Sequence, residues 1–279
     1  MEILLEGKTP AEQIKATFEN RVSYLKQNNI EPQLAVLGLN MKDASNSYVK
    51  RIENNCNKYG IGFELFIANS EEEFIENFNK VKDDLKYTSI MFQEPLPKHL
   101  SKLINEVDIN RDVEGVSDEN FGKLFKGDTN VNIPCTSRSV MEILSFYNID
   151  LEGKNVVVVG RSNIVGKPLI PQLLNKNATV TVCHSRTKNM SEILKKADVV
   201  IVAVGNINFL QKDMIKDDAI VIDVGTNYVN GKVVGDVDFE NVKDKAFAIT
   251  PVPGGVGIVT NALLIENIIA SAERMIENK

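Results

Sequence analysis

One stretch of the chain decides its fold, and it reads Val156-Val-Val-Val-Gly160-Arg161-Ser162-Asn163-Ile164-Val165-Gly166-Lys167-Pro168-Leu169. Four consecutive valines cannot form an amphipathic segment, so they predict a strand buried on both faces, as in the centre of a parallel sheet. Gly160 permits a tight turn after this strand, and residues 165–175 predict a helix. The free N–H groups and the dipole at the start of such a helix attract a phosphate group.

Two phosphate-loop patterns are similar to this turn, and spacing separates them. A nucleoside-triphosphate loop has four residues between its first glycine and Gly-Lys-Ser/Thr, whereas five separate Gly160 from Gly166, and Pro168 replaces the hydroxyl residue. The dinucleotide pattern G-x-G-x-x-G is approximated, because Ser162 takes the second glycine position and Gly166 comes one residue late. Dinucleotide binding is the favoured interpretation, and an ordinary strand-to-helix turn is the alternative.

The next predicted strand, Thr179-Val-Thr-Val-Cys183, supports a dinucleotide site. It ends in His184-Ser185-Arg186, at about the distance where a dinucleotide fold places the residue that contacts the ribose. An NAD site would have Asp or Glu there, whereas this chain has a hydroxyl and a cation, with Arg161 in the first loop. These groups suit a 2′-phosphate and favour NADP over NAD. The alternative is that Ser185 and Arg186 belong to a solvated loop.

Composition limits the class of protein. The 279 residues suffice for one large or two ordinary domains, and 43% hydrophobic with 25% charged residues is typical of a globular protein. A net charge of -6 argues against a nucleic-acid or anionic-membrane surface. We expect no signal peptide, no membrane-spanning segment and a cytoplasmic protein.

The cysteines and histidines offer little material for metal or redox chemistry. Cys56, Cys135 and Cys183 are far apart and odd in number, so they predict neither a disulfide framework nor a zinc site. With only His99 and His184 in addition, no metal site is expected.

Hydrophobic periodicity predicts alternating strands and helices, and hence parallel α/β layers in two domains. Thr9 is the expected cap of the first helix, and Ser70 with Glu73 forms a capping box for the third. The polar segment 111–133 is expected to be a long loop. The expected helices are 10–27, 46–59, one after Ser70, 137–147, 165–175 and 260–278; the expected strands are 34–39, 64–67, 89–93, 156–159, 179–183, 199–204, 219–223 and 247–250.

Several spaced motifs together resemble the methylenetetrahydrofolate dehydrogenase/cyclohydrolase family. In the second half they are Gly160-Arg-Ser-x-Ile-Val-Gly-x-Pro168, Asp223-Val-Gly-Thr-Asn227, Gly235-Asp-Val-Asp-Phe239 and Thr250-Pro-Val-Pro-Gly-Gly-Val-Gly257. In the first half they are Leu5-x-Gly-Lys8, Ala44-Ser45 with Tyr48-Val49, Gln93-x-Pro-Leu96, Asp112-Val-Glu-Gly115 and Pro134-Cys-Thr136. The resemblance covers essentially the whole chain, in order.

The resemblance implies a folate domain at 1–136, a Rossmann-like NADP domain at 137–255, a terminal segment 256–279 that returns to the first domain, a folate cleft between the domains, and a homodimer. The implied chemistry is oxidation of 5,10-methylene- to 5,10-methenyltetrahydrofolate, usually followed by hydrolysis to 10-formyltetrahydrofolate. The implied NADP contacts are Gly160, Arg161, Ser162, Ser185 and Thr226; the implied folate-cleft residues are Tyr48, Gln93, Glu114, Pro253, Gly254 and Gly257, of which the first three are the catalytic candidates.

The chain departs from the family where the second reaction is performed. Family members with both activities have a lysine four residues after the tyrosine, on the same helix face, and here that residue is Ile52. Lys50 points elsewhere, and Arg51 cannot act as a base at its pKa. The family's second aspartate in Asp-Val-Asp-Gly is Glu114, and its proline in the last loop is Ile258.

Oxidation needs orientation of the reacting groups, whereas hydrolysis needs proton transfer by a group such as lysine. We therefore expect an NADP-dependent dehydrogenase with weak or absent cyclohydrolase activity. One alternative is a fully bifunctional enzyme in which Arg51, Glu114 or an ordered water replaces the lysine. A second alternative is a folate- or NADP-binding protein without catalysis.

Overall fold

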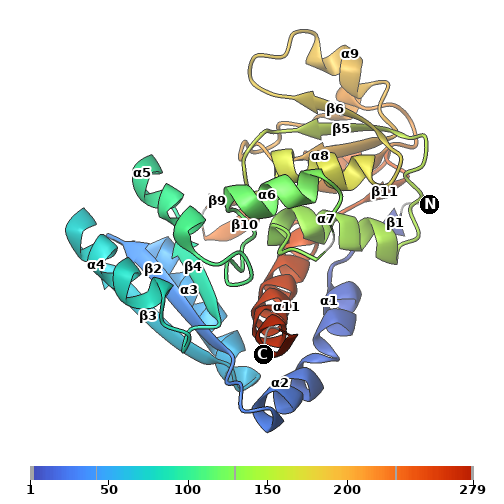
Figure 1. Cartoon of the computed structure of the whole chain (residues 1–279). Coiled ribbons are helices and arrows are strands. Elements are labelled where there is room, and N and C mark those ends of the chain that lie inside the picture. Colours follow the sequence, from blue (N-terminus) through green and yellow to red (C-terminus); the bar gives the residue numbers. More distant parts are fainter. Residues whose placement is uncertain (1–2, 42, 129, 230, 278–279) are drawn as a thin grey trace. The chain divides into compact units, whose positions relative to one another are not determined.

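The computed structural model describes residues 3–41, 43–128, 130–229 and 231–277, except for the side chains at positions 43–46 and 277. The chain forms two compact units, and Figure 1 labels many of their elements. Unit 1 contains residues 1–12, 124–128 and 134–260, and unit 2 contains residues 13–123, 129–133 and 261–279.

Unit 1 is built on a six-stranded parallel sheet in the order β1-β11-β8-β7-β5-β6. The strands are β1 (Ile3–Leu4), β5 (Asn155–Val159), β6 (Thr179–Cys183), β7 (Val199–Val202), β8 (Ile220–Asp223) and β11 (Ala248–Ile249). A separate antiparallel pair consists of β9 (Asn227–Val229) and β10 (Lys232–Val234). The helices are most of α1 (Lys8–Lys15), α7 (Cys135–Phe146), α8 (Gly166–Leu174), α9 (Met190–Leu194), η2 (Lys212–Met214), α10 (Phe239–Val242) and the start of α11 (Val256–Glu277).

β5 lies inside this sheet, as its sequence predicts. Its four valines are at most 2% exposed. Val159 at its carboxyl end lies opposite Cys183 of β6 on one side and Val202 of β7 on the other. The chain leaves β5 for β6 and later returns on the other side as β7, and doubly wound sheets bind ligands at the carboxyl ends of strands at such a switch point.

Unit 2 contains a three-stranded parallel sheet in the order β3-β2-β4. Its core includes Phe74 and Phe78 of α4, which pack edge-to-face against Phe92 of β4 with ring centroids 5.5 and 5.7 Å apart. The elements are α2 (Phe18–Gln27), β2 (Gln33–Leu39), α3 (Asp43–Lys58), β3 (Gly62–Ala68), α4 (Glu71–Lys82), β4 (Ser89–Gln93), α5 (Lys98–Ser101), η1 (Lys102–Glu106), most of α6 (Asp118–Phe125) and the rest of α11.

The structure confirms most expected elements and corrects three. The first expected helix is broken into α1 and α2, and Thr9 is no cap, because Ala11 N donates to the Gly7 carbonyl and α1 begins at Lys8. The expected loop at 111–133 contains α6, which the hydroxyl of Ser117 supports by accepting from Asn120 N at 3.4 Å. The last helix begins at Val256, four residues before the expected start.

The start of the chain belongs to unit 1 because β1 pairs with β11. The expected domain boundaries at residues 136 and 255 stay a prediction. The family motif at Ala44-Ser45 falls among the side chains that the structure does not describe.

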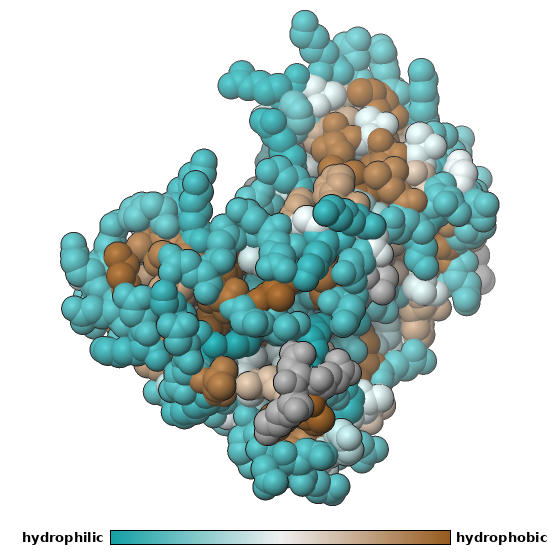
Figure 2. Space-filling model, viewed as in Figure 1, coloured by the Kyte–Doolittle hydropathy of each residue, from teal (hydrophilic) through white to brown (hydrophobic). Residues whose placement is uncertain are grey.

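Helix α11 resembles a membrane span in length and composition. By length and mean hydropathy, 1.3 over the window Val256–Ile276, it is apolar enough to cross a membrane. Its apolar side chains, however, are buried within the protein, with Leu263, Ile268 and Ile269 fully covered. A core helix accounts for its composition. Figure 2 shows a face that is largely hydrophilic, in keeping with the net charge of -6.

Candidate functional site

The turn after β5 brings backbone segments unusually close together. Gly160 has φ of +123°, and a Cβ atom there would lie 2.2 Å from the carbonyl oxygen of Ala203, which follows β7. A Cβ atom on Gly166 would lie 2.2 Å from the carbonyl oxygen of Gly160. Both positions therefore require glycine, as expected for a backbone that approaches a pyrophosphate closely.

Side chains with suitable chemistry project from this turn. Arg161 and Ser162 are exposed. The hydroxyl oxygen of Ser162 accepts a hydrogen bond from Val165 N at 3.2 Å, which orders the start of α8 and leaves the hydroxyl hydrogen able to donate. A cation, a hydroxyl and a helix N-terminus fit a phosphate-bearing dinucleotide.

Ser185 lies at the carboxyl end of the neighbouring strand β6. A turn fixes its position: His184 N donates to the Thr187 hydroxyl at 2.9 Å, and Thr187 N donates to the His184 carbonyl at 2.8 Å. Ser185 and Arg186 are both exposed on this turn. Since β5 and β6 are parallel neighbours, the two turns share one edge of the sheet.

Thr226 lies on the loop that follows β8, at the same edge, and is exposed. Its flanking residues are fixed by two buried carboxylates. Gly225 N donates to Asp223 Oδ1 at 2.9 Å, and the side chain of Asn227 donates to Asp236 Oδ1 at 2.9 Å. Burial raises the pKa of Asp223 to about 6, although three backbone N–H groups that donate to it act in the opposite direction.

The loop that contains Pro253, Gly254 and Gly257 packs against the start of the chain. Gly7 N donates to the carbonyl oxygen of Gly254 at 2.8 Å, and Gly254 has φ of +121°. Pro253 and Gly257 are exposed, and Gly257 is the second residue of α11.

In unit 2 the segments that carry Gln93 and Glu114 run beside each other. The segment of Glu114 runs beside β4, where Ile90 N donates to the Arg111 carbonyl at 2.8 Å. Gln93 donates to the Glu94 carbonyl at 2.7 Å, while its Oε1 atom is buried with no hydrogen-bond partner among the described residues. An orphaned acceptor of this kind fits a ligand that carries N–H groups.

The carboxyl group of Glu114 has an unusual environment. Burial raises its pKa to about 8, and the negative charges of Asp112 and Glu94 add to the increase. Asp112 is fully buried, and burial also raises its pKa. The shift favours the protonated carboxyl, the form that can donate a hydrogen bond.

Tyr48 and Ile52 lie one turn apart on α3, in unit 2. Tyr48 is partly exposed, with the guanidinium carbon of Arg51 5.8 Å from its ring centroid. Ile52 is only 2% exposed. Lys50 is exposed and bonded to Glu53 at 2.8 Å. Among the described residues 48–52, no lysine therefore lies on the helix face that Tyr48 and Ile52 share.

The sequence interpretation missed Glu94, Asp223 and Asp236 as residues that shape these two sites. Glu94 follows Gln93 directly. Asp236 follows Gly235, and Asp223 comes two residues before Gly225, a pattern that indicates close packing around a carboxylate. No group of three or more potential metal ligands occurs among the described residues.

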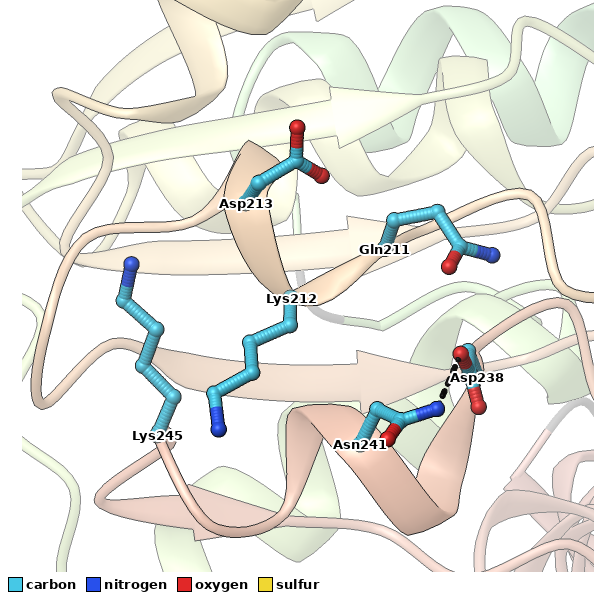
Figure 3. Close-up of a pocket in the computed structure, with 6 residues that line it drawn as sticks. All are labelled: Gln211, Lys212, Asp213, Asp238, Asn241 and Lys245. Carbon is cyan, nitrogen blue, oxygen red and sulfur yellow. Dashed lines mark hydrogen bonds between the residues drawn. The ribbon is translucent and has the colours of Figure 1, made fainter.

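A surface pocket of roughly 460 Å³ in unit 1 contains none of the expected site residues (Figure 3). It is lined by Gln211, Lys212, Asp213, Asp238, Asn241 and Lys245. Its mixture of charges does not indicate one class of ligand.

Comparison with known proteins gives consistent relationships over the whole chain. The family model "Tetrahydrofolate dehydrogenase/cyclohydrolase, catalytic domain" matches residues 5–114, and "Tetrahydrofolate dehydrogenase/cyclohydrolase, NAD(P)-binding domain" matches residues 134–276. The bifunctional protein FolD of Dictyoglomus turgidum is 43% identical over 281 residues, with 99% of both chains covered.

Two solved structures extend this comparison. The bifunctional FolD enzyme of Campylobacter jejuni has a TM-score of 0.93 and 42% identity, covering 99% of this chain and 100% of that one. The FolD of Trypanosoma brucei, solved with NADP cofactor and an inhibitor, has a TM-score of 0.90 and 30% identity, covering 99% of this chain and 98% of that one.

Proposed function

Because the chain belongs to the tetrahydrofolate dehydrogenase/cyclohydrolase family, we propose that it oxidises 5,10-methylenetetrahydrofolate to 5,10-methenyltetrahydrofolate with NADP, and that its hydrolysis of the product is weak or absent. The chain is an enzyme of one-carbon metabolism with a catalytic and an NAD(P)-binding domain. The loss of hydrolysis is the part of the proposal that distinguishes it from relatives named as bifunctional.

The NADP site consists of the loops at the carboxyl edge of the six-stranded sheet. Gly160 and Gly166 would let the backbone approach the pyrophosphate. Arg161, Ser162, Ser185 and Thr226 would hold the cofactor, and the cation and hydroxyl groups of Arg161 and Ser185 suit its 2′-phosphate. When bound, NADP supplies the hydride acceptor. The exposed cation and hydroxyl groups, and the two glycines that admit no Cβ atom, support this assignment.

In unit 2, the residues that we propose for folate contact are Tyr48, Gln93 and Glu114. In unit 1, the resemblance assigns Pro253, Gly254 and Gly257 of the last loop to folate contact. The orphaned oxygen of Gln93 is free to accept a hydrogen bond from an N–H group of the folate, and the raised pKa of Glu114 favours a carboxyl that donates a hydrogen bond. Oxidation requires no protein base, since the lone pairs of N5 and N10 stabilise the cation formed when hydride leaves the carbon between them. The protein's contribution to this step is orientation and exclusion of water.

The observation that carries the proposed loss of hydrolysis is the burial of an aliphatic side chain at Ile52. Hydrolysis requires that a water is deprotonated as it adds and that a nitrogen is protonated as the ring opens. Ile52 can do neither, Lys50 is committed to Glu53, and Arg51 remains protonated. Loss of such a group typically lowers the rate by roughly two to four powers of ten.

A second candidate function is the complete bifunctional reaction, and Glu114 is the observation that favours it. A carboxyl with a pKa of about 8 can give and take protons near neutral pH, and so could replace the lysine. This candidate requires hydrolysis that depends on Glu114.

The test of the proposed function follows two signals in one reaction with methylenetetrahydrofolate and either NADP or NAD. We expect reduced cofactor to form faster with NADP, and methenyl product to accumulate in equal amount. A reaction that forms reduced cofactor without accumulation of methenyl product supports the bifunctional candidate. Absence of reduced cofactor with both NADP and NAD excludes the dehydrogenase itself.

The homodimer and the cytoplasmic location also belong to the proposal, because only the resemblance supports them. Light scattering on the purified chain checks the first: a mass of twice 31.0 kDa is expected, and a mass of 31.0 kDa contradicts it.

A further inference from the structure

The motif Gly235-Asp-Val-Asp-Phe239 has no role in the proposed reaction, yet it supplies the most extensively bonded carboxylate described at the cofactor edge of the sheet. Asp236 is fully buried. Its Oδ2 atom accepts from Val204 N at 2.7 Å and Gly205 N at 2.9 Å, and its Oδ1 atom accepts from Asn206 N at 2.9 Å. These donors hold the buried carboxylate in one position.

The three N–H groups form an anion-binding nest. They are consecutive, they follow the carboxyl end of β7, and Gly205 has φ of +65°. Such concave groups of N–H donors often bind the phosphate of a ligand. Here a carboxylate of the chain fills the nest, so it anchors the 204–206 loop and is closed to a phosphate group of the cofactor.

The anchored loop adjoins the cofactor-binding turn. Ala203, at its start, is the residue whose carbonyl oxygen leaves no room for a Cβ atom on Gly160. Val204 and Ile207 are 36% and 42% exposed, so the loop presents apolar side chains at this edge of the sheet. These positions are where a cofactor bound to Gly160 would extend.

Asp236 connects this loop to a second one. The same Oδ1 atom accepts from the side chain of Asn227, the residue after Thr226, at 2.9 Å. The backbone of Asp236 is itself held, since its N–H donates to Asp223 Oδ1 at 3.0 Å and Val237 N donates to Asp223 Oδ2 at 2.9 Å.

Glycines make this packing of two carboxylates possible. A Cβ atom on Gly235 would lie 1.9 Å from Asp223 Oδ2, and one on Gly225 would lie 2.3 Å from Asp236 Cγ. The two glycines and two aspartates form one unit, which joins the loops after β7 and β8 to each other.

We propose that Asp236, supported by Asp223, is a positioning residue of the NADP site: it sets the relative placement of the 204–206 loop and of Thr226 without contacting the cofactor. The inference rests on the proposed function, because it assumes that NADP binds at this edge. It adds that the nest after β7 takes no ligand phosphate, so the cofactor's phosphate groups depend on the turn after β5.

The test compares NADP affinity, measured by calorimetry without folate, in the wild-type chain, Asp236→Asn and Asp238→Asn. The Asp236→Asn variant retains one acceptor oxygen but places an NH2 group against backbone donors. We expect its Kd for NADP to rise about tenfold or more. Asp238→Asn is the matched control, because Asp238 lies two residues later and bonds Asn241 at the surface pocket (Figure 3). Its Kd is expected to stay within about twofold.

A second measurement separates positioning from loss of folding. Amide hydrogen exchange at Val204, Gly205 and Asn206 should be slow in the wild-type chain without NADP and fast in Asp236→Asn, while β5 and β8 remain protected. The milder variant Asn227→Ala removes one donor to Asp236 and should raise the Kd less than Asp236→Asn does. It provides the affinity comparison if Asp236→Asn does not fold.

The outcomes distinguish the inference from the proposed function. If the wild-type chain binds NADP and the folded variants bind it equally well, Asp236 has only a structural role and the inference is wrong. If the wild-type chain itself binds no NADP, the proposed function fails first, and the inference fails with it.

Discussion

Asn267 of α11 donates from its side-chain nitrogen to the carbonyl oxygen of Val113 at 2.8 Å, and so holds the residue directly before Glu114. Asn132 holds Asp112, the residue before Val113, because its side-chain nitrogen donates to the Asp112 carbonyl oxygen at 2.8 Å. Both asparagines are buried. The conformation of the Glu114 segment therefore depends on side chains from distant parts of the chain.

Replacing Asn267 with alanine should loosen this segment. The carbonyl of Val113 would lose its buried donor, which costs about 1–3 kcal/mol of unfolding free energy. Thermal melting checks the stability, and a titration with a folate substrate should show weaker binding. The control is Asn105→Ala, which removes two exposed hydrogen bonds with Asp118, one donated by the Asn105 side-chain nitrogen and one accepted from Asp118 N. Equal effects of the two substitutions would show that Asn267 has no special role.

The raised pKa of Glu114 predicts how stability depends on pH. The folded state holds the proton up to a pKa of about 8, whereas the unfolded chain releases it near the ordinary value of 4.5. The stabilising contribution is thus complete below the unfolded pKa and is lost as pH rises through about 8, with a slope of at most about 1.4 kcal/mol per pH unit.

Denaturant unfolding at several pH values tests this prediction through Glu114→Gln, which cannot titrate. The difference in unfolding free energy, variant minus wild type, should increase as the pH rises from about 5 to about 8. The raised pKa values of Asp112 and Asp223 act in both chains and largely cancel in the difference. A difference that does not change with pH would refute the assignment of the raised pKa to Glu114.

Gly160 should tolerate no side chain, because a Cβ atom there would collide with Ala203. Comparison with Gly153 separates this collision from backbone strain. Gly160→Ala combines an unfavourable φ of +123° with a collision against Ala203, whereas Gly153→Ala has a φ of +69° and no atom within 4 Å of the new Cβ. The Gly153→Ala variant should lose about 1–2 kcal/mol from backbone strain alone. The Gly160→Ala variant should lose more and bind NADP weakly. Similar melting temperatures for both would contradict the collision.

The preference for NADP should depend on Arg161. Removal of its charge in Arg161→Ala is expected to raise the KM for NADP about tenfold or more, because a charge-assisted contact to phosphate is lost, and to leave the KM for NAD nearly unchanged. Lys176→Ala, which removes an exposed cation after α8, is the control. An equal loss with NADP and NAD would place the effect of Arg161 outside 2′-phosphate recognition.

Local signals explain which elements could be predicted from the sequence. The valines of β5 and the capping box of α4 depend on neighbours in sequence, and Glu73 N does donate to the Ser70 hydroxyl at 3.2 Å. α6 escaped prediction because its polar residue Asn120 turns inward to bond Asp112 at 2.8 Å, a contact that periodicity cannot reveal.

In the site, too, locally encoded features could be predicted and features that depend on tertiary contacts could not. The family motifs predicted which residues lie at the carboxyl edge of the large sheet, since strand ends and turns are encoded locally. The raised pKa of Glu114 arises first from burial, to which the charges of nearby Asp112 and of Glu94 from another segment add. The nest around Asp236 joins loops 30 or more residues apart. Such relationships depend on tertiary structure, and one sequence alone does not specify them.

A lysine at position 52 should be costly for the fold. The position is 2% exposed, so an ammonium group there is desolvated, its pKa falls and the variant loses roughly 2–5 kcal/mol of stability. Ile52→Met, similar in length and uncharged, is the control and should cost less than about 1.5 kcal/mol. Thermal melting compares them. Equal stability of the two variants would show that the lysine reaches water or a partner.

The central claim is tested most directly by the initial rate at which the purified wild-type chain hydrolyses supplied 5,10-methenyltetrahydrofolate, measured against buffer alone. The account predicts that neither the wild-type chain nor Ile52→Met hydrolyses methenyltetrahydrofolate faster than buffer does. It predicts that the folded fraction of Ile52→Lys does. A wild-type rate about a hundredfold or more above buffer would contradict it, since general acid–base catalysis would then be present without the lysine. Loss of that rate in Glu114→Gln would identify the replacement.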